Sequence, residues 1–180
     1  AAGADPEPDV RRHAVVALAA TQRDGASEAV IEALVSALGD EAVRELALTA
    51  LEQLGWQPDS DTGAAILALA ERDFPGLVAL GDAAVPLLAR ATGDPDTDKG
   101  AVLLRAQLFD TLGDIGTESA VRALEAGLKD PGGPARAVAA RRLGRFGDLA
   151  TEETGATLAQ MLREDASARV RVSAAVALGL

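Results

Sequence analysis

A single phrase recurs along the chain: an aspartate, an arginine six residues later, a leucine seven residues after that arginine, and then a glycine. It is complete in Asp130–Gly144 and in Asp165–Gly179. Self-similarity at a fixed period of about 20 to 50 residues is typical of proteins built from stacked structural repeats. The arginine and the leucine recur in three weaker copies: Arg11 and Leu18, Arg44 and Leu51, and Arg105 and Leu112. This repetition limits the fold to a stack of similar units.

The composition favours helices as those units. Hydrophobic residues make up 48% of the chain but aromatic residues only 2%, so the core must consist of Ala, Leu and Val. Ala and Leu have high helix propensity, and no stretch alternates apolar and polar residues as a strand would. We therefore predict an all-α fold, an α-α superhelix of about five helical hairpins in one domain covering residues 1–180.

Two kinds of helix alternate along the chain. The A helices begin at a Ser, Thr or Asp that can cap free backbone amides and end in an Asp-bearing turn. We expect them at 27–38, 82–91, 117–128 and 151–162. The B helices follow such a turn and carry the repeated arginine. We expect them at 8–21, 41–54, 99–112, 134–145 and 167–179.

The stretch at about 55–94 is an irregular repeat. A predicted helix over 62–72 lacks the arginine, and Phe74-Pro75-Gly76 is predicted to break it. Trp56, the single tryptophan, lies in the same stretch. Two interpretations stay open: Trp56 and Phe74 fill a wider gap between repeats, or they line a pocket for a small molecule.

The last B helix is apolar on more than one face, with Val170, Val172 and Val176 spread around it. A free end of a stacked-repeat protein normally carries a polar cap. Two explanations stay open: the chain is a piece of a longer protein, or this helix packs on a partner or on a second copy of the chain.

The segments Asp130–Gly144 and Asp165–Gly179 resemble HEAT repeats, most closely the short HEAT-like repeats named after phycobilisome lyases. The stretch Leu54–Pro58 followed by Leu77–Leu88 also resembles a segment seen inside such proteins. The resemblance covers nearly the whole chain. It implies a right-handed α-α superhelix, a HEAT-like solenoid, whose B helices line the concave face and whose usual task is to hold another protein. A minority of relatives handle chromophores or other small molecules.

The repeated arginines are interpreted as structural. An arginine that follows an Asp-bearing turn can bond that turn and the carboxylate of a neighbouring repeat. A ladder of such bonds would join the repeats, whereas the alternative is a ladder that binds a ligand. Its predicted members are Asp5, Arg11, Arg44, Arg105, Asp130, Arg136, Asp165 and Arg171.

The positions one and five residues after each arginine vary in chemical type. They lie on one face of a helix, and charged residues could not occupy that face so freely if it were buried. We expect this face to be exposed and concave, although a merely solvated face would show the same pattern. The residues predicted to contact a partner protein there are Arg12, Glu45, Thr49, Asp110, Arg141 and Arg145.

The charge balance and residue types exclude several functions. The formal net charge is −11, which argues against nucleic acid as a partner and, with 2% aromatics, against a base-flipping DNA-repair enzyme. The chain has no Cys and one His, so a thiolate or His-rich metal site is excluded. No stretch has the apolar length of a membrane span, and no signal peptide is recognised at the start. We expect a cytoplasmic protein without a cofactor.

Three smaller features have two interpretations each. His13 follows Asp9 by four residues and could pair with it, but a surface histidine is favoured over a catalytic one. The basic cluster Arg136–Arg145 could bind an anion, or nearby carboxylates could neutralise it; the second is favoured, with Asp148, Glu152 and Glu153 as partners. Asp94–Asp98 resembles half of a calcium loop but lacks its glycine and closing Glu.

These observations predict a non-catalytic scaffold that binds a partner protein along the concave face of its B helices. No catalytic residue and no metal ligand are assigned. The alternative, from another class, is a small-molecule or chromophore-handling protein of the lyase type. Its pocket would lie near Trp56 and Phe74.

Overall fold

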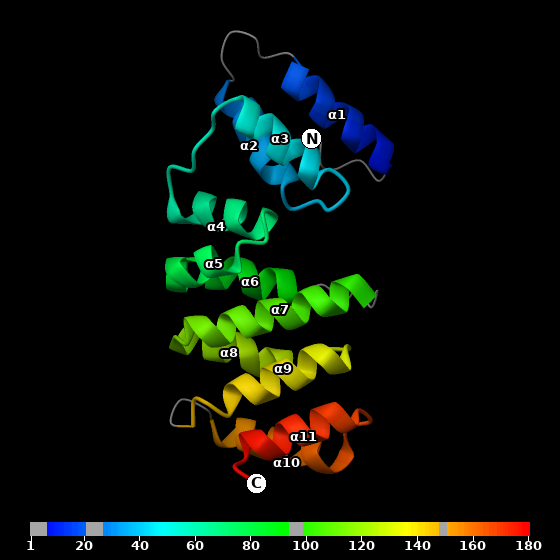
Figure 1. The fold of residues 1–180 in the computed structure, drawn as a ribbon, viewed down its shortest axis with the longest axis vertical. Helices are drawn as coiled ribbons and strands as arrows, with labels where there is room; N and C mark the ends of the chain where they lie inside the picture. Colours follow the sequence, from blue (N-terminus) through cyan, green and yellow to red (C-terminus); the bar gives the residue numbers. More distant parts are fainter. Residues whose placement is uncertain (1–6, 21–26, 94–98, 148–150) are drawn as a thin grey trace. The chain divides into compact units, whose positions relative to one another are not determined.

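The computed structural model describes residues 7–20, 27–93, 99–147 and 151–180. These residues form eleven α-helices and one short 3₁₀ helix, with no strand among them (Figure 1). The predicted all-α, HEAT-like solenoid class is therefore confirmed. The chain divides into two compact units, Ala1–Asp73 and Phe74–Leu180.

The first unit is built from four helices. They are α1 (Pro8–Ala20), α2 (Glu28–Ala37), α3 (Arg44–Gln53) and α4 (Asp61–Ala70). Helices α1 and α2 both pack against α3, and α2 also contacts α4. Their small apolar side chains form one core, which includes Val15, Leu34, Val43, Ala47 and Leu51.

The second unit contains the remaining helices and the clearest repeats. Its elements are α5 (Phe74–Leu80), η1 (Gly81–Ala83), α6 (Val85–Thr92), α7 (Lys99–Ile115), α8 (Glu118–Gly127), α9 (Gly133–Leu143), α10 (Glu152–Glu164) and α11 (Ala168–Ala177). The A helices α6, α8 and α10 pair with the B helices α7, α9 and α11 in three successive hairpins. Helix α9 packs against both α7 and α11, so the three B helices lie next to one another (Figure 1).

Side-chain caps fix where three helices begin. The hydroxyls of Ser60, Thr117 and Thr151 each accept a hydrogen bond from the backbone N–H three residues later. Thr117 and Thr151 stand where the sequence predicts the start of an A helix. A cap of this kind stabilises a protein by about 1 kcal/mol, because it satisfies a backbone amide that has no partner within the helix.

Close packing of neighbouring B helices requires a glycine at one copy of the repeated phrase, Gly144. A Cβ at Gly144 would lie 2.5 Å from the Cα of Ala177 in α11. Gly127 performs the same task within a hairpin, because a Cβ there would lie 2.9 Å from the Cβ of Ala139 in α9. Such distances are shorter than van der Waals contact, so a larger residue would push the helices apart.

The structure corrects the prediction for the irregular stretch. The helix expected over 62–72 ends at Ala70, and the break falls at Glu71–Asp73, where Arg72 has a positive φ of 58°. Phe74-Pro75-Gly76, predicted to break a helix, instead begins α5. Proline suits this place because the first turn of a helix does not need its N–H.

The next A helix also differs from the prediction. Instead of one helix over 82–91, the chain forms η1 and then α6, with a proline near the start of α6. The following B helix, α7, extends three residues beyond the predicted end, to Ile115.

Candidate functional site

Arg105 on α7 is the most buried arginine of the second unit. Its Nε donates to Asp130 Oδ2 at 2.7 Å and its Nη2 to Oδ1 at 3.3 Å. The two side chains are only 2% and 3% exposed. Asp130 Oδ1 also accepts the N–H of Gly132 at 2.7 Å, so the same carboxylate stabilises the turn before α9. This pair joins α7 to the following hairpin.

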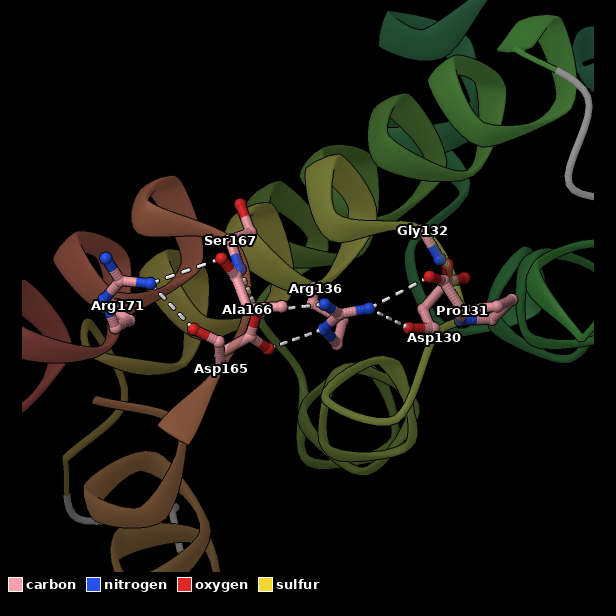
Figure 2. A network of polar contacts seen from close by, with 8 residues as sticks. All are labelled: Asp130, Pro131, Gly132, Arg136, Asp165, Ala166, Ser167 and Arg171. Carbon is pink, nitrogen blue, oxygen red and sulfur yellow. Dashed lines mark hydrogen bonds and ion pairs between the residues drawn. The ribbon is translucent and has the colours of Figure 1, made fainter. Parts of the chain in front are cut away.

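Arg136 on α9 repeats this arrangement one hairpin later. Its Nη1 donates to the carbonyl oxygens of Asp130 and Pro131 at 2.8 and 3.0 Å. Its Nε and Nη2 donate to Asp165 Oδ2 and Oδ1 at 2.8 and 3.0 Å (Figure 2). The hydrogen bond from Arg136 holds the pKa of Asp165 below its usual range. Arg136 therefore links its own turn to the turn of the next hairpin.

Arg171 on α11 makes half of these contacts. Its Nη1 donates to the carbonyl oxygens of Asp165 and Ala166 at 2.8 and 3.3 Å, as Arg136 does one hairpin earlier. No carboxylate of the described residues receives its Nε and Nη2 edge, which points away from Asp165 in Figure 2. Arg136 and Arg171 thus share the bonds to their own turn, but only Arg136 also bonds the carboxylate of a following turn.

The first unit has a shorter form of the ladder. Arg11 Nε donates to Asp40 Oδ2 at 2.5 Å, and Arg44 Nε donates to the carbonyl oxygen of Leu38 at 3.1 Å. Burial raises the pKa of Asp40, but the bonds from Arg11 and from the N–H of Ala42 outweigh it and leave that pKa lowered. Asp5, the remaining predicted member, lies outside the described residues.

The positions one and five residues after these arginines form a largely exposed face, which we call the B-helix face. Asp110, Ala106 and Ala137 are less exposed than the rest, and Ala137 is fully buried on the central helix α9. The exposed members are Arg12, Val16, Glu45, Thr49, Arg141, Val172 and Val176.

The B-helix face of the second unit contains an open hollow of about 380 Å³. It brings together three residues that the sequence predicts for partner binding: Asp110 of α7, Arg141 of α9, and Arg145 just beyond the end of α9. The remaining lining residues are Arg142, Gly144 and Val176. The valine is one of the varied positions, but the sequence did not place it beside the arginines.

Arg142 organises the hollow and was missed as a site residue. Its Nε donates to Asp110 Oδ1 at 2.7 Å, and its Nη1 and Nη2 donate to the two carboxylate oxygens of Asp114 at 2.6 and 3.3 Å. The hydrogen bond from Arg142 lowers the pKa of Asp110, and the same bond raises the pKa of Arg142. Arg141 Nη2 reaches the same Asp110 oxygen at 3.2 Å.

The structure corrects the predicted neutralisation of this basic cluster. Among the described residues, Arg141 and Arg142 pair with Asp110 and Asp114 of α7, and Arg136 pairs with Asp165, rather than with Glu152 or Glu153 of α10. Asp148 lies outside the described residues. The side chain of Arg145 has no hydrogen bond or ion pair within the described part of the chain. Two carboxylates therefore face three guanidinium groups, which leaves the hollow locally positive.

The first-unit candidates are exposed but not gathered in one place. Arg12 lies 4.0 Å from a carboxylate oxygen of Asp9, and Thr49 donates to the backbone carbonyl of Glu45. His13 pairs with Asp9 only through the backbone carbonyl, at 2.6 Å from its Nδ1. Among the residues that the structure describes, no side-chain carboxylate pairs with His13.

The two aromatic candidates lie in different units. Trp56 is half-buried and packs against the core of the first unit. Phe74 is half-buried at the start of α5. Within the described ranges, no group of three or more His, Asp or Glu residues could hold a metal ion. The acidic stretch 94–98 lies outside them.

No single described helix has both the length and the hydropathy of a membrane span. One pair of segments, Phe74–Ala83 and Val85–Thr92, together has the length and composition of a span, but the pair is bent by 114°.

Comparison with protein families agrees with the geometry of the second unit. Residues 99–179 match the family model of HEAT repeats. This part of the chain is similar to HEAT repeats. The match begins at α7 and extends past α11, so the matched region contains the ladder from Arg105 to Arg171 and the whole hollow. No curated protein matches the chain. HEAT repeats commonly serve as protein-interaction scaffolds.

Proposed function

We propose that the chain is a non-catalytic scaffold that binds another protein along the B-helix face. The observation that carries this proposal is the hollow, where Asp110, Arg141 and Arg145 lie together. The ladder arginines are engaged in joining the repeats, whereas these side chains lie on the open face of the same helices.

The chemistry of the hollow suits binding better than catalysis. A general acid or base works best when its pKa lies near the working pH. The guanidinium of Arg142 stays protonated, and the pKa of Asp110 is lowered from an already acidic value by the bond from Arg142. Such groups keep fixed charges at neutral pH, and fixed charges orient a partner.

The alternative is a small-molecule or chromophore-handling protein of the lyase type, with its pocket near Trp56 and Phe74. It has less support, because Trp56 packs against the apolar core of the first unit.

Site-specific photo-crosslinking tests the scaffold proposal. A photoreactive amino acid replaces Val176 on the B-helix face or, as a matched control, Ala126, which is exposed on the A helix α8. Both proteins are irradiated in extract from cells that make the protein. We expect a discrete crosslinked species from the Val176 position and none from the Ala126 position. Crosslinking only from Ala126, or equally from both, would contradict the proposal.

A further inference from the structure

The hollow has a charge pattern that selects its occupant. We propose that it binds an acidic segment of a partner protein, with a carboxylate held by Arg141 and Arg145 and a nearby aliphatic side chain covering Val172 and Val176. This inference rests on the proposed function and adds the chemistry of the partner.

The two carboxylates beside the arginines of the hollow both accept hydrogen bonds from Arg142. Asp114 directs both of its oxygens to Arg142, and one oxygen of Asp110 accepts from both Arg142 and Arg141. The guanidinium of Arg142 is therefore already paired with carboxylates. Its neighbours differ. The side chain of Arg141 is 51% exposed and makes one hydrogen bond, at 3.2 Å. The side chain of Arg145 makes no hydrogen bond with the described residues.

The positions of the two less engaged arginines suit a carboxylate. Residues four apart lie on the same face of a helical turn. Although α9 ends at Leu143, Arg145 stays in a tight turn, because its N–H donates to the carbonyl of Arg142 at 3.1 Å. The planar guanidinium group donates two parallel hydrogen bonds to a carboxylate, which favours an acidic ligand over a neutral one.

The apolar half of the surface comes from the next helix. Val172 and Val176 lie one turn apart on α11 and are 64% and 59% exposed. Val176 lines the hollow together with the arginines. Packed helices lie about 8–10 Å apart, a distance that about three residues of extended chain span. The partner segment should therefore carry its aliphatic residue about three positions from its acidic residue.

Other ligands fit the same surface less well. A basic segment would bring its charge against Arg141 and Arg145, while the oxygens of Asp114 are already bonded. Free phosphate would leave the two valines uncovered. The acidic net charge of −11 opposes any anion at long range, but charges farther than about 8 Å are largely screened at physiological salt. Contacts inside the hollow are shorter than that.

NMR titration of the full ¹⁵N-labelled chain tests the inference. The probes are ten-residue Gly/Ser peptides that contain Glu and Leu three positions apart, Lys and Leu at the same places, or Glu alone. We expect the Glu–Leu peptide to shift the amide signals of Arg141, Arg145, Val172 and Val176. We expect at least about tenfold weaker binding from the Glu-only and Lys–Leu peptides, since each lacks half of the contacts.

Two variants locate the carboxylate. Arg145→Gln should weaken the Glu–Leu peptide about tenfold, because it removes the charge but keeps a similar shape. Arg122→Gln on α8, an exposed arginine paired with Glu118, is the matched control and should leave binding unchanged. Equal binding of the Lys–Leu peptide, or an unchanged affinity in Arg145→Gln, would overturn the inference. Saturation of the same shifts by inorganic phosphate at equal affinity would also overturn it.

The outcomes separate this inference from the proposed function. If Val176 crosslinks to a partner while the Glu–Leu peptide shifts no signal, the scaffold proposal is supported and the proposed acidic partner segment is wrong. If Val176 does not crosslink and the peptide shifts no signal, both are wrong.

Discussion

Arg105 and Arg145 both lie in the region that matches HEAT repeats, but Arg105 is buried in the core and Arg145 is exposed on the surface. The side chain of Arg105 is 2% exposed and donates twice to Asp130, whereas Arg145 is exposed on the rim of the hollow. Arg105 recurs as Arg136 and Arg171 in the following repeats, and Arg145 does not recur at equivalent positions. The comparison indicates that the repeated arginines Arg105 and Arg136 hold neighbouring repeats together, while the unrepeated Arg145 leaves its side chain exposed on the hollow.

Loss of the buried ladder arginine Arg105 should have the largest effect on stability. Arg105→Ala leaves the carboxylate of Asp130 buried without its guanidinium partner, and removal of one member of a buried ion pair costs about 3–5 kcal/mol. Urea unfolding followed by circular dichroism measures the change. The double variant Arg105→Met with Asp130→Asn removes both charges and keeps an acceptor for the turn, so it should recover much of the loss. A change below about 1 kcal/mol in Arg105→Ala would contradict the structural role.

Arg136 and Arg171 sharpen the comparison, because they share one set of contacts and differ in another. Arg136→Ala removes bonds to two carbonyls and to Asp165, and bonds to a charged group contribute about 1.5–3 kcal/mol. Arg171→Ala removes carbonyl bonds and only a charge effect on Asp165, so its cost should be smaller, nearer to about 1 kcal/mol. Both free energies of unfolding come from the same urea titration. Equal costs would show that the carboxylate adds nothing to the ladder.

Acid should reduce the cost of Arg136→Ala. Because the bond from Arg136 lowers the pKa of Asp165 below its ordinary value of 3.8, it stabilises the fold fully above that value. The stabilisation is lost as the pH falls through the lower pKa of the folded state. The difference in unfolding free energy between wild type and Arg136→Ala should therefore shrink below about pH 3.8. For Arg171→Ala the change with pH should be smaller, because Arg171 affects Asp165 only through its charge.

Much of the fold could be predicted because its signals are local or periodic. Thr117 and Thr151 begin helices as capping residues do, and the repeated phrase places the B helices that carry Arg136 and Arg171. The exposure of Arg141 and Val176 could be predicted because helical periodicity puts them on one face and charged residues vary freely at its positions.

The errors arose where a residue has a distant partner or where a local signal has two meanings. Arg142 bonds Asp110 and Asp114, which lie about thirty residues earlier, whereas reasoning from neighbouring residues pointed to Glu152 and Glu153. A proline breaks a helix in its interior but is accepted in the first turn. Pro75 lies in the first turn of α5, and its sequence neighbours did not distinguish these two positions. The hollow depends on three helices at once, so no single segment reveals it.

Substitution of the exposed Arg145 should have the smallest effect on stability. Arg145→Gln removes a charge that bonds no described residue, and surface substitutions of this kind usually change stability by no more than about 0.5 kcal/mol. Urea unfolding should therefore place this variant beside wild type, while its affinity for the Glu–Leu peptide falls about tenfold. A loss above about 1 kcal/mol would mean that Arg145 also supports the fold. The contrast with Arg105 would then fail, because both arginines would be structural and weaker peptide binding could no longer be assigned to the carboxylate contact.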